Sequence, residues 1–289
     1  RASPELFALL QACQDRLAEM LEAVRDQQVI PDGQALIDTI KRFRANPDEQ
    51  LSVPTSVHLE PLAPVAAMDD EADADILETG AGPLKFHPVH HGTLWFEVGG
   101  RVVWVDPWTQ GDLTGPKADV VLITDIHQDH HDPAGIAAVR GPNAVIVAPK
   151  VVADLVPGAI ALANGETRDL GFLRVEAVPM YNLTRGPEEG KLFHDRGRGN
   201  GYVLTIGERR IYISGDTECT PEMRALTNID VAFVCMNLPY TMPPAEAAAC
   251  VAAFKPKVLY PYHYRDSNLD DLDPPLAGSG VEVRKRRWY

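Results

Sequence analysis

The chain has 289 residues, of which 45% are hydrophobic and 24% are charged, and its formal net charge is −14. This composition supports a sizeable hydrophobic core and excludes disordered, collagen-like and low-complexity proteins. No apolar run is long enough to span a bilayer, and the negative charge argues against general affinity for nucleic acid or anionic lipid.

Two amphipathic helices are predicted near the N-terminus, over residues 3–26 and 33–44. Ser3 and Pro4 suit the start of the first helix, and leucines then recur at helical spacing. Prolines punctuate an acidic stretch from residue 47 to about 85, which predicts a linker or a surface arm. We therefore expect residues 1–85 to form a helical extension and an acidic arm. The helices would pack on the main domain or form a homo-oligomer.

From residue 86 the sequence changes to short β runs joined by Gly, Asp and Pro turns. Hairpins are predicted for residues 93–98 with 102–105 and for 202–206 with 211–214. Near-continuous apolar runs predict buried strands at 119–123, 144–148, 231–234 and 258–260. Helices are predicted at 133–140, 221–227 and 244–254. Residues 86–289 therefore predict a domain of mixed α/β layers.

The four cysteines, at positions 13, 219, 235 and 250, are too few and too scattered for a disulfide framework or a cysteine-rich zinc site. We expect buried free thiols, because unpaired cysteine is commonly an interior residue. No signal peptide is visible, but the chain starts at Arg1 rather than Met. A cytoplasmic location and export with a removed leader are both open.

Metal-binding residue types gather directly after the strand predicted at 119–123. Residues 124–132 read Thr-Asp-Ile-His-Gln-Asp-His-His-Asp, and burying so many unpaired polar groups would be costly. A metal ion explains them economically. Imidazole and carboxylate suit Zn²⁺, Mn²⁺ or Fe²⁺, and the lack of thiolates argues against a closed structural zinc site. Alternation along the loop would let it serve two adjacent ions.

This pattern, Thr-Asp-x-His-x-Asp-His, resembles the Thr-His-x-His-x-Asp-His signature of the metallo-β-lactamase superfamily, with Asp125 in place of the first histidine. Segments 103–107, 211–217 and 260–263 resemble further family segments in the same order. The resemblance covers about residues 86–265 and is closest to the branch that contains ascorbate-phosphate lactonases. It implies a four-layer αββα sandwich, here with an N-terminal helical extension.

The same resemblance implies two metal sites. One consists of Asp129, His130, Asp216 and His263, and the other of Asp125, His127 and a third histidine. Where that histidine is expected, after the strand predicted at 173–178, the sequence reads Val-Pro-Met-Tyr-Asn. The alternatives are a weaker site, with Asn182 as a poor ligand, completion by His194, or a single ion. We expect one or two divalent ions, Zn²⁺ in first place and Mn²⁺ or Fe²⁺ otherwise.

The implied activity is that of a metal-dependent hydrolase. A bound ion lowers the pKa of water to about 7, so a metal-bound hydroxide would cleave a small anionic ester, lactone or phosphodiester. Asp129 would orient the hydroxide or take its proton, and Asp216 would space the ions. The departures at Asp125 and Asn182 argue against a true β-lactamase. The alternatives are a degenerate metal-binding module without turnover and a di-iron oxidoreductase.

Five further residues are candidate substrate contacts. The loop 185–201 combines glycines with basic side chains, which suits an anionic group. Two candidates follow the strand predicted at 231–234, and one precedes the first hairpin. The candidates are His91, Asn182, Arg198, Asn237 and Tyr240. The expected partner is a small anionic molecule, with neither nucleic acid nor membrane involved.

Overall fold

The computed structural model describes residues 39–41 and 75–289. Residues 39–41 are helical, within the helix predicted at 33–44, whereas the helix predicted at 3–26 lies outside the described residues. The expected subunit contact through these helices and residues 47–74 of the acidic arm also lie outside them, whereas residues 76–79 and 82–85, predicted as part of the arm, belong to strands. In the described part of the chain, no helix has the length and apolarity needed to cross a membrane.

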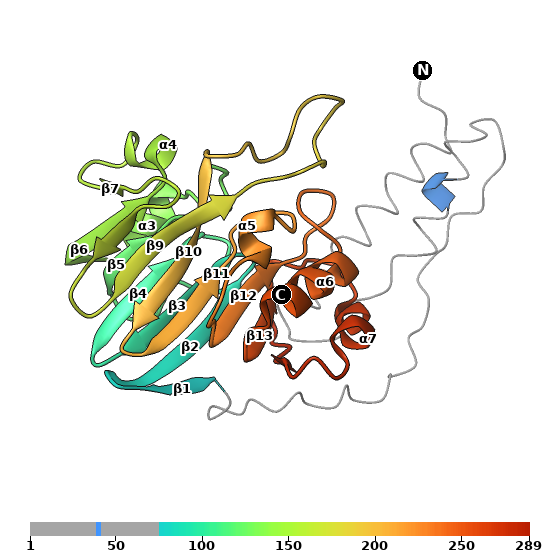
Figure 1. Cartoon of the computed structure of the whole chain (residues 1–289). Coiled ribbons are helices and arrows are strands. Elements are labelled where there is room, and N and C mark those ends of the chain that lie inside the picture. The colour runs from blue at the N-terminus through green and yellow to red at the C-terminus, as the bar shows by residue number, and fades with distance from the viewer. Residues whose placement is uncertain (1–38, 42–74) are drawn as a thin grey trace, which may run out of the picture. The chain divides into compact units, whose positions relative to one another are not determined.

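Two mixed β-sheets, each of seven described strands, form the centre of the unit that spans Glu71–Tyr289 (Figure 1). The first sheet follows chain order: β1 (Ile76–Thr79), β2 (Gly82–His90), β3 (Thr93–Val98), β4 (Arg101–Val105), β5 (Ala118–Leu122), β6 (Arg140–Ala148) and β7 (Ile160–Ala161). Pairing is antiparallel from β1 to β4 and parallel from β4 to β7. The sheet thus begins upstream of residue 86, where the sequence changes character.

The second sheet repeats this plan. Its strands are β8 (Thr167–Asp169), β9 (Arg174–Met180), β10 (Gly199–Ile206), β11 (Arg209–Ile213), β12 (Val231–Cys235), β13 (Val258–Tyr262) and β14 (Glu282–Val283). Pairing is again antiparallel over the first four strands and parallel over the last four. The two sheets therefore correspond in strand order and in the direction of pairing.

Helices cover the outer face of each sheet. Beside the first sheet lie α3 (Pro133–Val139) and α4 (Lys150–Ala153), whose Ile136 and Val152 share an apolar cluster with Trp104. On the second sheet lie α5 (Pro221–Arg224), α6 (Pro244–Phe254), η1 (Leu269–Leu272) and α7 (Asp273–Leu276). Between the sheets, the rings of Phe86 and Phe233 lie 5.3 Å apart. The predicted four-layer αββα sandwich is confirmed (Figure 1).

The disposition of the cysteines corrects one expectation. Cys219 and Cys250 form a disulfide that joins the loop before α5 to α6, so they are not free thiols. Cys235 is buried and free, as expected. The two paired cysteines are separated by 31 residues in sequence, and only the packing of α6 beside that loop brings them together.

The buried carboxylate of Asp230 links neighbouring segments of the second sheet by hydrogen bonds, at the end where β12 begins. It accepts hydrogen bonds from Lys257 Nζ (2.8 Å), Arg210 N (2.9 Å) and Arg209 Nη1 (3.2 Å). Burial opposes its ionisation, but these contacts, led by that with Lys257, hold the pKa of Asp230 below its ordinary value. Ionised Asp230 therefore stabilises the folded state above the pKa of about 4 that an unfolded aspartate has. The contribution is lost as the pH falls through the lower, folded value.

We expect Asp230→Asn to lower the free energy of unfolding by about 1–3 kcal/mol at pH 7, because charged donors lose their acceptor. The loss should shrink as the pH falls below about 4, because the unfolded carboxylate is protonated there while the folded one still holds its charge down to a lower pH. Urea unfolding at pH 7 and pH 3.5 checks this. Asp154→Asn, at an exposed pair with Lys150, is the matched control and should change little. An equal loss at both pH values would contradict the prediction.

Candidate metal centre

The candidate site residues lie on loops that follow the carboxyl ends of strands from both sheets. Asp106 follows β4, residues 124–130 follow β5, and Asp216, Asn237 and His263 follow β11, β12 and β13. Parallel strands bring such loops to one edge, which is where open α/β sheets commonly place ligands. The backbone is unusual there: Asp106, His263 and His91 have positive φ angles of 45°, 49° and 57°. Strained backbone of this kind is typical of functional sites.

Four of the predicted ligands come together as one group, here called the inner cluster: Asp129, His130, Asp216 and His263. His130 Nε2 lies 3.4 Å from Asp216 Oδ2, and His263 Nε2 lies 3.5 Å from Asp216 Oδ1. Asp129 Oδ2 lies 3.3 Å from His263 Nε2. Their ligand atoms are all within 4.8 Å of one another, which is compatible with a single ion.

Buried polar atoms that lack hydrogen bonds indicate a cation site in the inner cluster. Nε2 of His130, His194 and His263 and Oδ1 of Asp216 are all buried, and none has a hydrogen-bond partner among the described residues. Leaving such atoms unpaired in a protein interior costs free energy. A metal ion bound between them would accept their lone pairs and remove that cost. The inner cluster therefore has the donors, the burial and the negative charge of a divalent metal site.

His130 is oriented from behind by Asp106, which is fully buried. Asp106 Oδ2 lies 2.8 Å from His130 Nδ1, and Thr124 donates to Asp106 through both N and Oγ1. This arrangement directs Nε2 toward the inner cluster. Burial lowers the pKa of His130, but the carboxylates of Asp216, Asp129 and Asp106 reverse this and raise it well above the usual value. The same negative field favours a metal cation.

His263 is held by Asn237 and by the backbone of His91. The Asn237 side-chain amide lies 3.0 Å from His263 Nδ1, while its Oδ1 is buried and has no partner in the described part of the chain. Because amide oxygen and nitrogen have the same shape, turning the amide lets Oδ1 accept from Nδ1–H and frees Nε2 for a metal. His263 N also donates to His91 O (3.1 Å). Gly92 leaves room for both rings, since a Cβ there would lie 3.1 Å from His263 and 3.4 Å from His130.

Asp125, His127 and His194 form a second group, here called the outer cluster. His194 Nδ1 lies 2.5 Å from Asn182 Oδ1, which leaves Nε2 directed at Asp216 Oδ2 (3.5 Å) and Asp125 Oδ2 (4.0 Å). Of the alternatives for the third position, the structure therefore places His194 there and puts Asn182 behind it. Asn182 is itself held by Glu218 Oε1 and the Tyr240 carbonyl.

A hydrogen-bonded chain reaches Asp129 from the end of the described chain. Tyr289 Oη lies 2.7 Å from His91 Nδ1, and His91 Nε2 lies 3.0 Å from Asp129 Oδ2. Burial lowers the pKa of His91 to about 4, although its hydrogen bond to Asp129 opposes that shift. A neutral His91 that accepts from Tyr289 must donate to Asp129, so this chain orients the Asp129 carboxylate.

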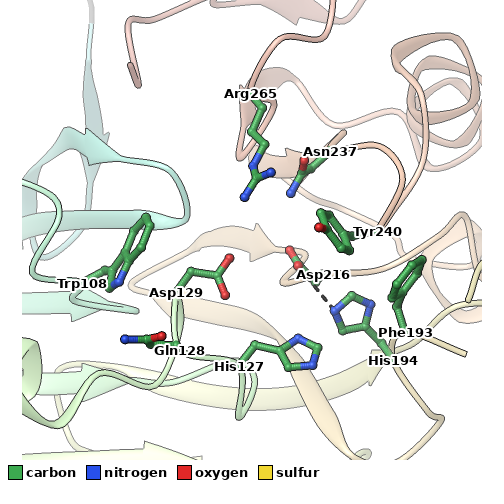
Figure 2. Close-up of a pocket in the computed structure, with 10 residues that line it drawn as sticks. All are labelled: Trp108, His127, Gln128, Asp129, Phe193, His194, Asp216, Asn237, Tyr240 and Arg265. Atoms are coloured by element: carbon green, nitrogen blue, oxygen red, sulfur yellow. Dashed lines mark ion pairs between the residues drawn. The ribbon is translucent and has the colours of Figure 1, made fainter. Parts of the chain in front are cut away.

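A pocket of about 360 Å³ opens above these groups (Figure 2). Trp108 and Phe193 provide apolar walls, and the floor is formed by His127, Asp129, His194 and Asp216. Asn237, Tyr240 and Arg265 line another side, and the Arg265 guanidinium lies over the Tyr240 ring, 5.5 Å from its centroid. Figure 2 shows this guanidinium directed into the pocket. The site thus combines acidic metal ligands with an accessible cation, Arg265.

The five candidate substrate contacts have different positions. Asn237 and Tyr240 line the pocket. His91 is buried behind Asp129, Asn182 behind His194, and Arg198 forms a bidentate ion pair with Asp125. None of these last three is among the lining residues.

Several residues of the centre were assigned no role from the sequence. Asp106 had a usable signal, because it directly follows an apolar strand, as Asp125 nearly does. Arg265 lies two residues beyond His263, but nothing in the sequence separates it from other surface arginines. Tyr289 reaches the site only through the tertiary fold, since its partner His91 is 198 residues away.

Comparison with known proteins agrees with this geometry. The family described as β-lactamase superfamily domain matches residues 85–263. A UPF0173 metal-dependent hydrolase of Aeropyrum pernix is 32% identical over 218 residues, covering 68% of this chain and 86% of the relative.

The chain is also similar to solved structures of metal-dependent hydrolases. The structure of a protein named as a metal-dependent hydrolase from Parabacteroides distasonis shares 41% identity with a TM-score of 0.70, covering 73% of this chain and 97% of that one. Igni18, a metallo hydrolase of Ignicoccus hospitalis, shares 22% identity with a TM-score of 0.54, covering 70% and 94% respectively, and supports the fold alone.

Proposed function

The chain belongs to the β-lactamase superfamily and is a metal-dependent hydrolase, and from this premise we propose that it cleaves a small anionic ester, lactone or phosphodiester. The observation that carries the proposal is the pocket, with unpartnered metal ligands in its floor and Arg265 at its side. No carboxylate of the described chain pairs with this guanidinium. A substrate whose anionic group lies near the bond to be cleaved would satisfy both features.

The inner cluster would hold a divalent ion, and we propose Zn²⁺, with Mn²⁺ or Fe²⁺ as alternatives. The outer cluster offers a second position. When bound, such an ion lowers the pKa of water and polarises a carbonyl or phosphoryl oxygen of the substrate. Asp216 lies between the clusters, within 3.5 Å of ligand atoms from both, and would fix the spacing of two cations.

Asp129 is the residue proposed to orient the attacking water and receive its proton. Its side chain is 25% exposed and faces the pocket, whereas Asp216 is buried. His91 holds Asp129 Oδ2 from behind, so the carboxylate keeps one orientation relative to the substrate. Arg265, Tyr240 and Asn237 would bind the anionic group, while Trp108 and Phe193 exclude water from the bond that reacts.

The alternative, a degenerate metal-binding module without turnover, arose because no histidine follows β9 at the expected place. His194 lies beside Asp125 and His127, so the observation that motivated this alternative no longer favours it. The similar proteins from Aeropyrum pernix and Parabacteroides distasonis are both named hydrolases, which supports turnover.

The preference for an anionic substrate can be tested directly by kinetics. With Zn²⁺ bound, the protein is expected to cleave anionic members of a panel of esters, lactones and phosphodiesters faster than neutral counterparts of the same shape. Arg265→Gln should raise KM for the anionic members by about tenfold and leave kcat nearly unchanged, because it removes binding common to ground and transition states. Steady-state kinetics on the paired panel provides the measurement.

Two controls accompany this experiment. Arg265→Lys keeps the charge and should recover part of the affinity, and Arg224→Gln changes an arginine outside the pocket. Equal cleavage of neutral and anionic members by the wild type, with no effect of Arg265→Gln, would reject the anionic class. Metal-dependent hydrolysis itself would survive that result.

A further inference from the structure

Arg198 occupies an unexpected position for a residue predicted to contact substrate. Its Nε and Nη2 donate to Asp125 Oδ1 (3.1 Å) and Oδ2 (2.9 Å), a bidentate pair that engages both carboxylate oxygens. Asp125 is completely buried, and the Arg198 side chain is 22% exposed. Asp125 is also the residue at which the chain departs from the family signature, because it stands where the first histidine is expected. The aspartate that replaces the signature histidine is therefore the same residue that binds Arg198.

The backbone holds Arg198 in this position. Asn200 N donates to Thr124 O (2.8 Å), which joins the start of β10 to the loop that carries Asp125. Gly199 lies so close to this loop that a Cβ would stand 2.9 Å from Thr124 O and 2.3 Å from Met180 Cε. Gly197, on the other side, has a positive φ of 84°. Arg198 thus projects from a tightly fitted segment rather than from a free loop.

The same pairing involves two of the three outer-cluster residues, Asp125 and His127. His127 Nδ1 lies 3.0 Å from Asp125 Oδ2, and its Nε2 lies 3.4 Å from Arg198 Nη2. In contrast, the unpartnered atoms of the centre are Nε2 of His130, His194 and His263 and Oδ1 of Asp216. His194 Nε2 is nearer to Asp216 (3.5 Å) than to Asp125 (4.0 Å). The unpartnered buried atoms therefore surround Asp216, whereas both carboxylate oxygens of Asp125 and both ring nitrogens of His127 already lie within hydrogen-bond distance of other groups.

Charge leads to the same conclusion. The inner cluster has two carboxylates, Asp129 and Asp216, which match one divalent ion. The outer cluster has one carboxylate of its own, and Arg198 already neutralises it. A second divalent ion beside Asp125 would meet a neighbouring positive charge in a half-buried site, where like charges repel strongly.

We propose that Arg198 is a built-in cation of the outer cluster: it holds Asp125 in place of a second metal ion. The resting protein then binds one divalent ion tightly, in the inner cluster, and a second only weakly. This inference depends on metal binding and not on the identity of the substrate, so its failure would leave the proposed substrate class untouched.

Titration of the metal-free protein with Zn²⁺ alone tests the inference, by calorimetry and by metal analysis after gel filtration. The wild type should retain one ion per chain, with the second bound at least about 100-fold more weakly, as a neighbouring like charge implies. Arg198→Gln should strengthen the second site by roughly tenfold or more, because that charge is removed. Arg196→Gln is the matched control, since Arg196 lies on the same loop but pairs with Glu222, and its stoichiometry should remain that of the wild type.

Two results would overturn the inference. One is a wild type that binds two ions with equal affinity. The other is a weaker second ion in Arg198→Gln, which would make Arg198 a positioning residue for a metal-binding Asp125. Because Arg198→Gln removes the arginine partner of a buried carboxylate and risks misfolding, crystals of the wild type grown with Zn²⁺ give an independent readout. Anomalous scattering should show one full peak, in the inner cluster, with Arg198 still on Asp125; a second full peak with Arg198 displaced would refute the proposal.

Discussion

Replacing Asp216 with asparagine is expected to abolish tight metal binding and, with it, turnover. Asp216 is the carboxylate around which the vacant lone pairs of His130, His194 and His263 converge. Asparagine offers one weak oxygen ligand and directs an N–H₂ group at positions where a cation belongs. Loss of a residue that merely supports a ligand costs about 10–100-fold in metal affinity, so loss of this ligand should exceed the upper end of that range.

The measurement is metal content after dialysis, together with hydrolysis rates at saturating Zn²⁺. Asp230→Asn is the matched control, because it makes the same chemical change at a buried aspartate that is not among the metal-ligand groups. It should lower stability but retain metal. An Asp216→Asn protein that keeps both its metal and its turnover would show that the centre has been misassigned.

The sequence predicted the fold well where elements are apolar and regular. The hairpins at 93–105 and 202–214 and the buried strands β5, β12 and β13 were expected from their runs of Val, Ile, Leu and Ala. Strand β2 was missed because Pro83 and Pro88 interrupt its pattern. Strands β7 and β14 have two residues each, too few for a periodicity to register. Such elements are defined by their neighbours in the sheet and not by their own sequence.

The candidate site was predictable to the extent that its residues are adjacent in the chain or end a strand. The loop after β5 supplied Asp125, His127, Asp129 and His130 together, because a compact motif carries its own spacing. The residues that orient these ligands follow no such rule. Asn182, predicted as a substrate contact or weak ligand, supports His194, and Arg198 pairs with Asp125. Their roles depend on contacts between loops of different strands, which local sequence does not encode.

Asp106→Asn should weaken metal binding about 10–100-fold, although Asp106 is not among the metal-ligand groups. Asp106 Oδ2 lies 2.8 Å from His130 Nδ1 and accepts from Thr124 Oγ1 at 2.6 Å, while Oδ1 accepts from Thr124 N at 2.8 Å. All three contacts require an acceptor. An asparagine amide must present its N–H₂ group to one side, where it meets either Thr124 N–H or His130.

If the amide nitrogen faces His130, Nδ1 becomes the acceptor and the proton moves to Nε2, which removes the lone pair that a metal needs. If it faces Thr124, two donors oppose each other in a fully buried position, which costs about 1–3 kcal/mol of stability. The first orientation lowers the metal affinity of the inner cluster, the second lowers the stability of the fold around it, and neither touches the pocket.

Competition with a chelator of known affinity measures the effect, and higher Zn²⁺ should restore turnover because the chemistry itself is unchanged. Asp119→Asn is the matched control at the other end of β5, where Asp119 binds Arg101 and Val102 N. It should leave metal affinity at the wild-type value. Wild-type affinity in Asp106→Asn would contradict the prediction, because His130 would then keep its tautomer without a carboxylate, and the charge of Asp106 would need a purely structural explanation.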